Sequence, residues 1–203
     1  MISLLPTALR RTLPAIATVL AVLLREPSTA RADTESSVHA EVDPFPFATG
    51  RWGVQIGARP AALRGLRLSI ASFSVDVPDV VTELGGNEGF HLDVRPLSGG
   101  VYALYYFAPP GRDGLTVGGS IRYLRLRFSH DAETAAVDVH QLSPEAIVGY
   151  HWHPFHNGFY VQPWLALGVV LWRSDEATVG AHTYDELPVS VFFTANVGYE
   201  HRF

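Results

Sequence analysis

Arginine is the basic residue of this chain, and it recurs between apolar residues. The 15 basic residues are all arginine. A guanidinium group binds carboxylate or phosphate through a rigid fork of donors, and an unpaired buried charge costs several kcal/mol. Arginines that share one face must therefore pair within the protein or attract an anion. The charged residues that alternate with apolar neighbours are Arg51, Arg59, Arg67, Arg95, Arg122, Arg125, Arg127 and Arg202, with Asp93, Glu145 and Glu200 as the acids.

Two further groups of residues could do chemistry. His151 and His153 are two residues apart, so on a strand they share a face and could bind one metal ion, although no inward carboxylate is fixed nearby by the sequence. Ser129 and His130, with Asp131 close by, contain the residue types of an acyl-transfer site. Neighbours in sequence point to opposite faces of a strand, which argues against that pair.

Alternation of apolar and polar residues predicts the elements that hold these side chains. Period-two alternation is typical of half-buried strands. We interpret Leu124, Leu126 and Phe128 as a continuation of the apolar face of Ile121 and Tyr123 after a bulge near Tyr123, which would leave Arg122, Arg125 and Arg127 on the polar face. Eight strands are predicted, within residues 51–59, 66–73, 90–95, 101–107, 115–128, 145–153, 159–172 and 189–203.

The connections favour an antiparallel meander. Short turns follow residues 107 and 153, while long acidic loops follow residues 128 and 172. Alternating short turns and long loops are typical of a transmembrane barrel. The first half fits this rule poorly, since the connection at 60–65 is short and that at 75–88 is long.

Alternation alone does not separate a membrane barrel from a soluble one. Aromatic residues at the strand ends, such as Trp52, Tyr150 and Trp152, resemble interfacial belts, and the last two strands are long enough to cross a bilayer. We therefore predict an all-β, eight-stranded antiparallel up-and-down transmembrane β-barrel with its apolar face outward. A soluble secreted barrel is the alternative.

The N-terminus predicts export. Arg10 and Arg11 precede an apolar run, and Ala30, Arg31 and Ala32 precede Asp33, the order of a secretory signal peptide over residues 1–32. Residues 33–50 are expected to be a flexible acidic periplasmic segment, and residues 51–203 the barrel. Without residues 1–32 the chain has 11 arginines against 19 acidic residues, which argues against nucleic acid as a partner.

The ending NVGYEHRF leads to a family resemblance. With the signal peptide and the eight amphipathic stretches, it resembles the small outer-membrane β-barrel proteins, the OmpA-like and OmpW-like group. The resemblance implies that Tyr199 and Phe203 belong to the signal read by the barrel-assembly machinery, although His201 stands where an apolar residue is usual. It further implies Sec-type export to the outer membrane of a diderm bacterium, contact with outer-membrane lipids and lipopolysaccharide, and a monomer.

Several functions fit such a barrel. We expect a structural, surface-adhesive or small-ligand-binding role, without enzymatic activity or a cofactor. A basic lumen could instead form a narrow anion-preferring channel, with the eight arginines, Glu145 and Glu200 as its binding residues. A lipid A-modifying enzyme is a third reading, but the His-x-Ser arrangement of the deacylases is absent.

Overall fold

The computed structural model describes residues 35–155, 157–185 and 189–203, so the predicted signal peptide lies outside the described residues. The short elements are α2 (Pro44–Ala48), a 3-10 helix (Ala61–Leu63), α3 (Asp79–Leu84), β8 (Trp172–Arg173), β9 (Thr178–Val179) and β10 (His182–Thr183). The longer strands are β1 (Ser37–Val42), β2 (Trp52–Arg59), β3 (Leu66–Val77), β4 (Phe90–Tyr106), β5 (Gly114–His130), β6 (Ala136–His151), β7 (Phe159–Val169) and β11 (Val189–Arg202).

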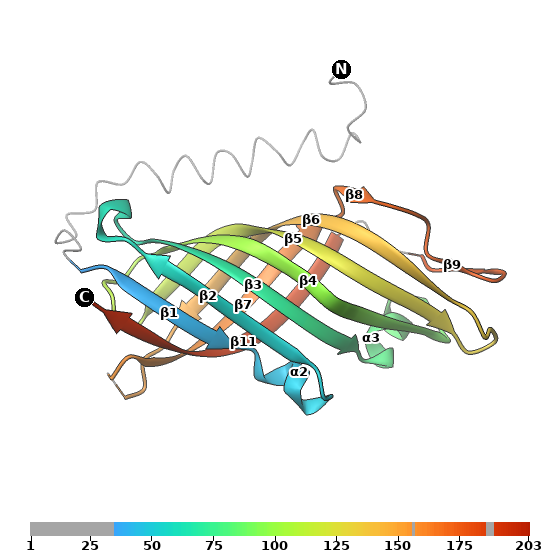
Figure 1. The fold of residues 1–203 in the computed structure, drawn as a ribbon, viewed down its shortest axis with the longest axis horizontal. Helices are drawn as coiled ribbons and strands as arrows, with labels where there is room; N and C mark the ends of the chain where they lie inside the picture. The colour runs from blue at the N-terminus through green and yellow to red at the C-terminus, as the bar shows by residue number, and fades with distance from the viewer. Residues whose placement is uncertain (1–34, 156, 186–188) are drawn as a thin grey trace, which may run out of the picture. The chain divides into compact units, whose positions relative to one another are not determined.

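The eight longer strands form a closed antiparallel ring (Figure 1). Each pairs with its neighbour in the chain, and β1 pairs with β11, with Ser37 opposite Arg202 and Val42 opposite Val197. Closure leaves no free sheet edge, as a strand structure in lipid requires. The chain is therefore the predicted eight-stranded up-and-down barrel.

Three of the predicted boundaries are wrong, and two of these errors cancel in the strand count. The long acidic loop predicted after residue 128 is mostly strand, because β6 begins at Ala136 and not at residue 145. Residues 33–50 are not a flexible segment throughout, because Ser37–Val42 is the barrel strand β1 and Pro44–Ala48 is α2. The separate strands expected at 90–95 and 101–107 are one strand, β4. With β1 included, the connection at 60–65 lies at the same end as the chain termini, and the poor fit of the first half disappears.

The predicted bulge in β5 is also wrong. The register of β5 with β6 is continuous from Gly114 to Ser129. The irregularity lies in the facing strand: β4 takes five steps from Val94 to Gly99 while β5 takes three from Leu126 to Tyr123. Two extra residues preserve the alternation of β4, and Leu97 within the bulge has a φ of 72°.

The outer surface carries an apolar belt around the ring. The side chains at its middle are strongly exposed, among them Ile56 at 56%, Ile70 at 57% and Val191 at 67%. The inner face is polar, with Gln55, Ser69 and Gln162 buried inside it. Apolar outside and polar inside is the arrangement of a membrane-spanning barrel. Aromatic residues exposed at the edges of the belt include Tyr123, Tyr150, Trp152, Trp172 and Tyr199.

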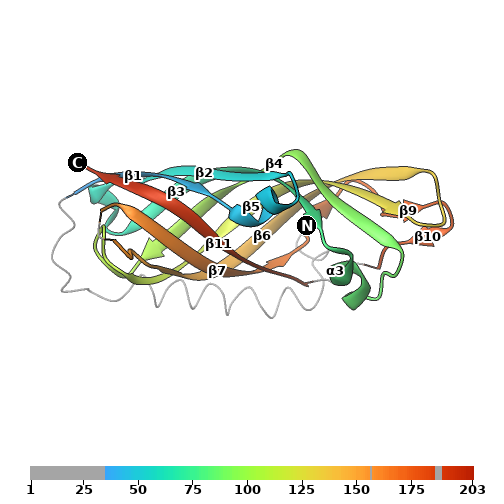
Figure 2. The same ribbon diagram turned by 90° about the horizontal axis from the view of Figure 1, so that it is seen from below.

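The two ends of the barrel differ. The terminal end holds Ser37, Phe203 and the turns that join β2 to β3, β4 to β5 and β6 to β7. The distal end holds α3, the β5–β6 hairpin, β9 and β10, and β4, β5 and β6 extend there beyond β1 and β2 (Figure 2). On the same side of the belt, α2 follows the distal end of β1, and β8 pairs with β6. No helix among the described residues is long and apolar enough to cross a membrane.

Candidate functional site: the lumen and its two ends

Inward-facing residues fill the lumen at three levels. We call these the terminal network, the central pair Arg122–Glu145 and the distal core. Each is built by the alternation of the strands, which sends every second side chain inward.

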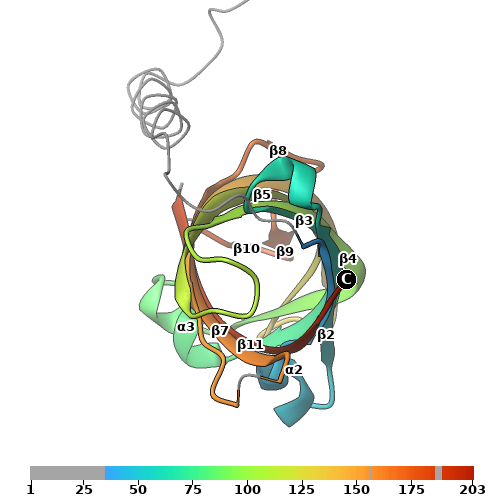
Figure 3. The ribbon, with the colours of Figure 1, turned by 90° about the vertical axis from the view of Figure 1, so that its left-hand side faces the viewer.

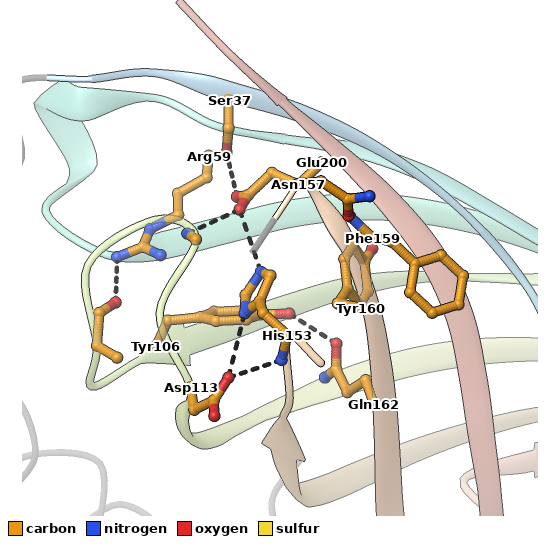
Figure 4. A network of polar contacts seen from close by, with 12 residues as sticks. Ser37, Arg59, Tyr106, Asp113, His153, Asn157, Phe159, Tyr160, Gln162 and Glu200 are labelled. Carbon is orange, nitrogen blue, oxygen red and sulfur yellow. Dashed lines mark hydrogen bonds and ion pairs between the residues drawn. The ribbon is translucent and has the colours of Figure 1, made fainter. Parts of the chain in front are cut away.

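The terminal network closes the mouth of the barrel around Glu200 (Figure 4). One carboxylate oxygen of Glu200 accepts a hydrogen bond from Ser37 Oγ at 2.6 Å, and the other accepts one from the Gly111 amide at 3.0 Å. The Asp113 carboxylate accepts the His153 amide at 2.6 Å. These contacts hold the β4–β5 turn inside the ring of strands, where Figure 3 shows it in yellow-green.

A buried ion pair lies deeper in the same network. Arg67 Nη1 is 2.6 Å from Glu41 Oε1, and both side chains are at most 3% exposed. Glu41 also accepts hydrogen bonds from Tyr160 Oη at 2.6 Å and Asn196 Nδ2 at 2.7 Å. Because the charge of Arg67 is paired with Glu41 inside the barrel, this pair needs no external anion.

Aromatic and amide side chains complete the packing around Arg67. Its guanidinium lies 4.7 Å from the ring centre of Tyr106, a cation–π contact, and donates to Gln162 at 2.8 Å. Beside this network is a cavity of about 10 Å³ lined by Glu41, Gln55 and Arg67 among others. That volume holds about one water molecule.

The two predicted metal ligands do not converge. The imidazoles of His151 and His153 are buried and stacked, with ring centres 4.5 Å apart and planes within 8°. Nitrogen lone pairs lie in the ring planes, so parallel stacked rings do not direct them at a common point. Within the described ranges, no group of three His, Cys, Asp or Glu side chains could hold a metal ion.

The central pair lies inside the barrel, on the neighbouring strands β5 and β6. Arg122 contacts the carboxylate of Glu145, which also accepts a hydrogen bond from Ser120 at 2.8 Å. The Arg122 guanidinium lies 5.1 Å from the ring centre of Phe192 and 5.8 Å from that of Phe73. The Arg122 guanidinium therefore packs near two aromatic rings as well as against its counter-charge.

The distal core reverses the pattern of the belt. Here the inward side chains are apolar, and the segment of β9 and β10 packs over them through Val179. The outward residues of the same strands are polar or charged, as His91 and Arg127 illustrate. Apolar side chains inside and polar side chains outside are the arrangement of a strand pair that faces water. The buried members of the distal core are Phe90, Leu124, Leu126, Phe128, Val139, Ala177 and Val179.

A histidine bridge ties the distal surface together. His91 Nδ1 lies 2.8 Å from Asp79 of α3, and Nε2 lies 2.8 Å from Asp131 beyond β5. His91 is on the part of β4 that extends beyond the apolar belt. Hydrogen bonds that His91 donates to the carboxylate of Asp131, and then to that of Asp79, raise the pKa of His91 above its ordinary value. The protonated imidazole therefore stabilises the docking of α3.

The ten residues predicted to line the lumen lie in four different parts of the structure. Arg59, Arg67, Arg122, Glu145 and Glu200 are buried inside the barrel. Arg51 pairs with Asp76 at the distal end, with Nε 2.8 Å from the carboxylate, and Arg202 is exposed at the terminal rim. Arg127 is exposed on the outer surface, and Arg95 and Arg125 are partly exposed. Placing Arg125 and Arg127 inside was wrong because β5 has no bulge to change their face.

Sequence reasoning missed the strand that carries Glu41. The signal was present in SVHAEV, where Val38, Ala40 and Val42 alternate with Ser37, His39 and Glu41. The neighbouring prolines and acidic residues hid it. The inward positions Tyr160, Gln162 and Asn196 lie in strands that the sequence does predict, but their contacts with Glu41 and Arg67 depend on β1.

Ser129 and His130, the residue types weighed for acyl transfer, have different partners in the structure. His130 Nδ1 accepts the amide of Ala132 at 3.1 Å, and its ring stacks on His182 with ring centres 3.7 Å apart. Ser129 lies opposite His91, both of whose nitrogens face carboxylates. Among the described residues, no serine–histidine hydrogen bond joins these groups.

Comparison with known proteins finds similarity only among solved structures. No protein-family model and no curated protein sequence matches the chain. Neisserial surface protein A (NspA) is 13% identical over 81% of this chain and 93% of its own, with a TM-score of 0.45. The N-terminal β-barrel domain of Pseudomonas aeruginosa OprF is 14% identical over 85% and 100%, with a TM-score of 0.44.

A major outer membrane protein from Thermus thermophilus is 11% identical over 82% of this chain and 99% of its own, with a TM-score of 0.46. All three are distant matches. The fold assignment rests on the strand pairing and the apolar belt of the chain itself: it is an eight-stranded antiparallel β-barrel of the membrane-spanning type.

Proposed function

We propose that this chain is a sealed outer-membrane barrel that holds a folded extension at the cell surface, in a structural or surface-adhesive role. The observation that carries the proposal is the change from a polar, ion-paired lumen to an apolar distal core. The barrel supplies an anchor in lipid, and the distal core supplies a rigid platform outside it.

The orientation follows from the connections. In bacterial outer-membrane barrels the short turns are periplasmic and the longer loops are extracellular. The turns at the terminal end are short, whereas the distal side of the belt holds two helices and the long connection from β7 to β11. We therefore place the termini in the periplasm, where Tyr199 and Phe203 would serve the assembly machinery during insertion. Sec export and a monomeric state belong to the same proposal.

A sealed lumen is the feature to test against the channel hypothesis. The buried Arg67–Glu41 pair, the Arg122–Glu145 pair and the distal core lie in series along the axis. A planar bilayer containing the refolded barrel is expected to show no steady single-channel current. A stable anion-selective conductance would overturn the sealed-lumen proposal.

The surface role needs an experiment of its own. The chain has no cysteine, so a Glu133→Cys variant would place one thiol in the β5–β6 connection. On intact cells this thiol should react with a membrane-impermeant maleimide, while an Arg112→Cys variant in the β4–β5 turn should not. Adhesion of expressing cells to immobilised host glycoproteins would then be compared with that of cells lacking the barrel. Labelling in the reverse order would refute the orientation, and unchanged adhesion would favour a purely structural role.

A further inference from the structure

The outer surface of β5 changes from apolar to basic at one residue. Leu115, Val117, Ile121 and Tyr123 face outward in the apolar belt, and the next outward residues are Arg125 and Arg127. The neighbouring strand β6 changes at the same height, because Leu142 is opposite Tyr123 and His140 is opposite Arg125. Two arginines and a histidine therefore lie directly above the aromatic edge of the belt.

The geometry orients the donors of this surface. Arg125 and Arg127 are two residues apart on one face, a separation of about 6.6–6.8 Å along a strand. Tyr123 Oη lies 2.6 Å from His140 Nδ1, and the two rings stack with centres 5.8 Å apart. A hydroxyl that donates to Nδ1 leaves the His140 proton on Nε2, where it can be donated to a ligand.

The acidic neighbours of this surface leave Arg125 uncompensated. Asp93 and Asp138 are directly opposite Arg127 in the ladders of β4 and β6, and Asp93 also contacts Arg51 at 3.4 Å. In the part of the chain that the structure describes, Arg125 has no carboxylate within 4.0 Å. Its guanidinium donates only to the Pro96 carbonyl, at 3.4 Å.

The depth of the surface identifies the kind of ligand. Aromatic residues at the edge of a transmembrane barrel mark the boundary between acyl chains and headgroups, and Tyr123, Trp172 and Leu97 are all strongly exposed there. Arg125 and His140 are two residues beyond this boundary along their strands, which places their hydrogen-bond donors at the height of lipid phosphates. Arginine forms charge-assisted bidentate hydrogen bonds with phosphate.

We propose that Arg125, Arg127 and His140 bind the phosphate of an outer-leaflet glycolipid, the phosphorylated lipid A of lipopolysaccharide. Tyr123 and Trp172 contact the apolar part of the same lipid. The proposal rests on the orientation given above, which places this surface in the outer leaflet. It assigns a specific role to two arginines that are not in the lumen.

Native mass spectrometry of the barrel in detergent micelles would test the site. The probes are bisphosphorylated lipid A, chemically dephosphorylated lipid A and free pyrophosphate. The variants are Arg125→Gln, Arg127→Gln and the double variant, with Arg112→Gln in the exposed turn at the terminal end as the matched control. Heat-modifiable gel migration of each variant checks folding and the barrel assignment separately.

Bisphosphorylated lipid A should be retained by the wild-type barrel and by the Arg112 variant. The double variant should bind it more weakly by about tenfold or more, since about 1.4 kcal/mol of a charge-assisted bond corresponds to tenfold in affinity. Dephosphorylated lipid A should bind no better to the wild type than to the double variant. Equal retention of both lipids by the wild type would overturn the proposal, as would equal losses in the Arg112 and Arg125 variants. Binding of pyrophosphate in competition with lipid A supports a phosphate site, whereas failure to compete at saturating concentration refutes it.

Discussion

The sharpest test of the buried pair in the terminal network is Glu41→Gln. Glu41 is the acceptor on which three donors converge: Arg67, Tyr160 and Asn196. Glutamine has nearly the same shape, but it has a single acceptor oxygen and directs an NH₂ group at one of these donors. The substitution also leaves the Arg67 guanidinium, 3% exposed, without its counter-charge.

The magnitude follows from that burial. Removing one partner of a buried ion pair destabilises a protein by about 3–5 kcal/mol, because the remaining charge stays desolvated. Urea unfolding of the refolded barrel in detergent micelles, followed by tryptophan fluorescence, measures the free energy of unfolding. We expect Glu41→Gln to lower it by about 3–5 kcal/mol.

Two companion variants separate burial from charge. Asp76→Asn breaks the partly exposed pair with Arg51 and should cost about 1 kcal/mol or less. The double variant Glu41→Gln/Arg67→Met removes the stranded charge, so it should be more stable than Glu41→Gln alone. If Glu41→Gln costs no more than Asp76→Asn, or if adding Arg67→Met brings no recovery, the assignment of Glu41 and Arg67 as a buried mutual pair is refuted.

Three further predictions address other parts of the barrel. A Cβ at Gly118 would lie 2.0 Å from the Ala103 carbonyl oxygen, so Gly118→Ala should separate β4 from β5 and cost about 1–3 kcal/mol in the same assay; an unchanged midpoint would contradict this close approach. The pKa of His91 is raised in the folded state, so protonated His91 stabilises the docking of α3 fully at pH values below the ordinary histidine pKa, and this stabilisation is lost as the pH rises through the folded-state pKa. Amide hydrogen exchange of α3, corrected for intrinsic rates, should therefore speed up with rising pH. The variant His91→Asn should abolish that dependence. Glu200→Gln weakens the acceptor that holds Gly111, so a cysteine placed at Ala108 should react with a thiol reagent about tenfold faster; equal rates would show that Glu200 does not hold the turn.

The sequence predicts the architecture well because period-two alternation is a local property. Strand type, the strands β5, β7 and β11, the second half of β6 and the outward apolar face all follow from it. The inward placement of Arg59, Arg67 and Arg122 follows as well. The partners of these residues cannot be predicted from alternation. Arg67 contacts Glu41 only because β1 closes the ring, and that closure pairs residues from opposite ends of the chain.

The bulge wrongly predicted near Tyr123 has a different cause. Alternation shows which residues share a face of a strand, but it does not show what surrounds that face. When the apolar residues of a strand move from odd to even positions, two explanations are available: an inserted residue that rotates the strand, or an environment that inverts around an unrotated strand. The sequence of β5 is the same in both. Its continuous register with β6 selects the second explanation, so that Ile121 faces outward in the apolar belt while Phe128, seven residues on, faces the distal core. The position where the apolar pattern changes phase therefore marks where the outer surface of the barrel changes from apolar to basic, and under our proposal this is the edge of the membrane.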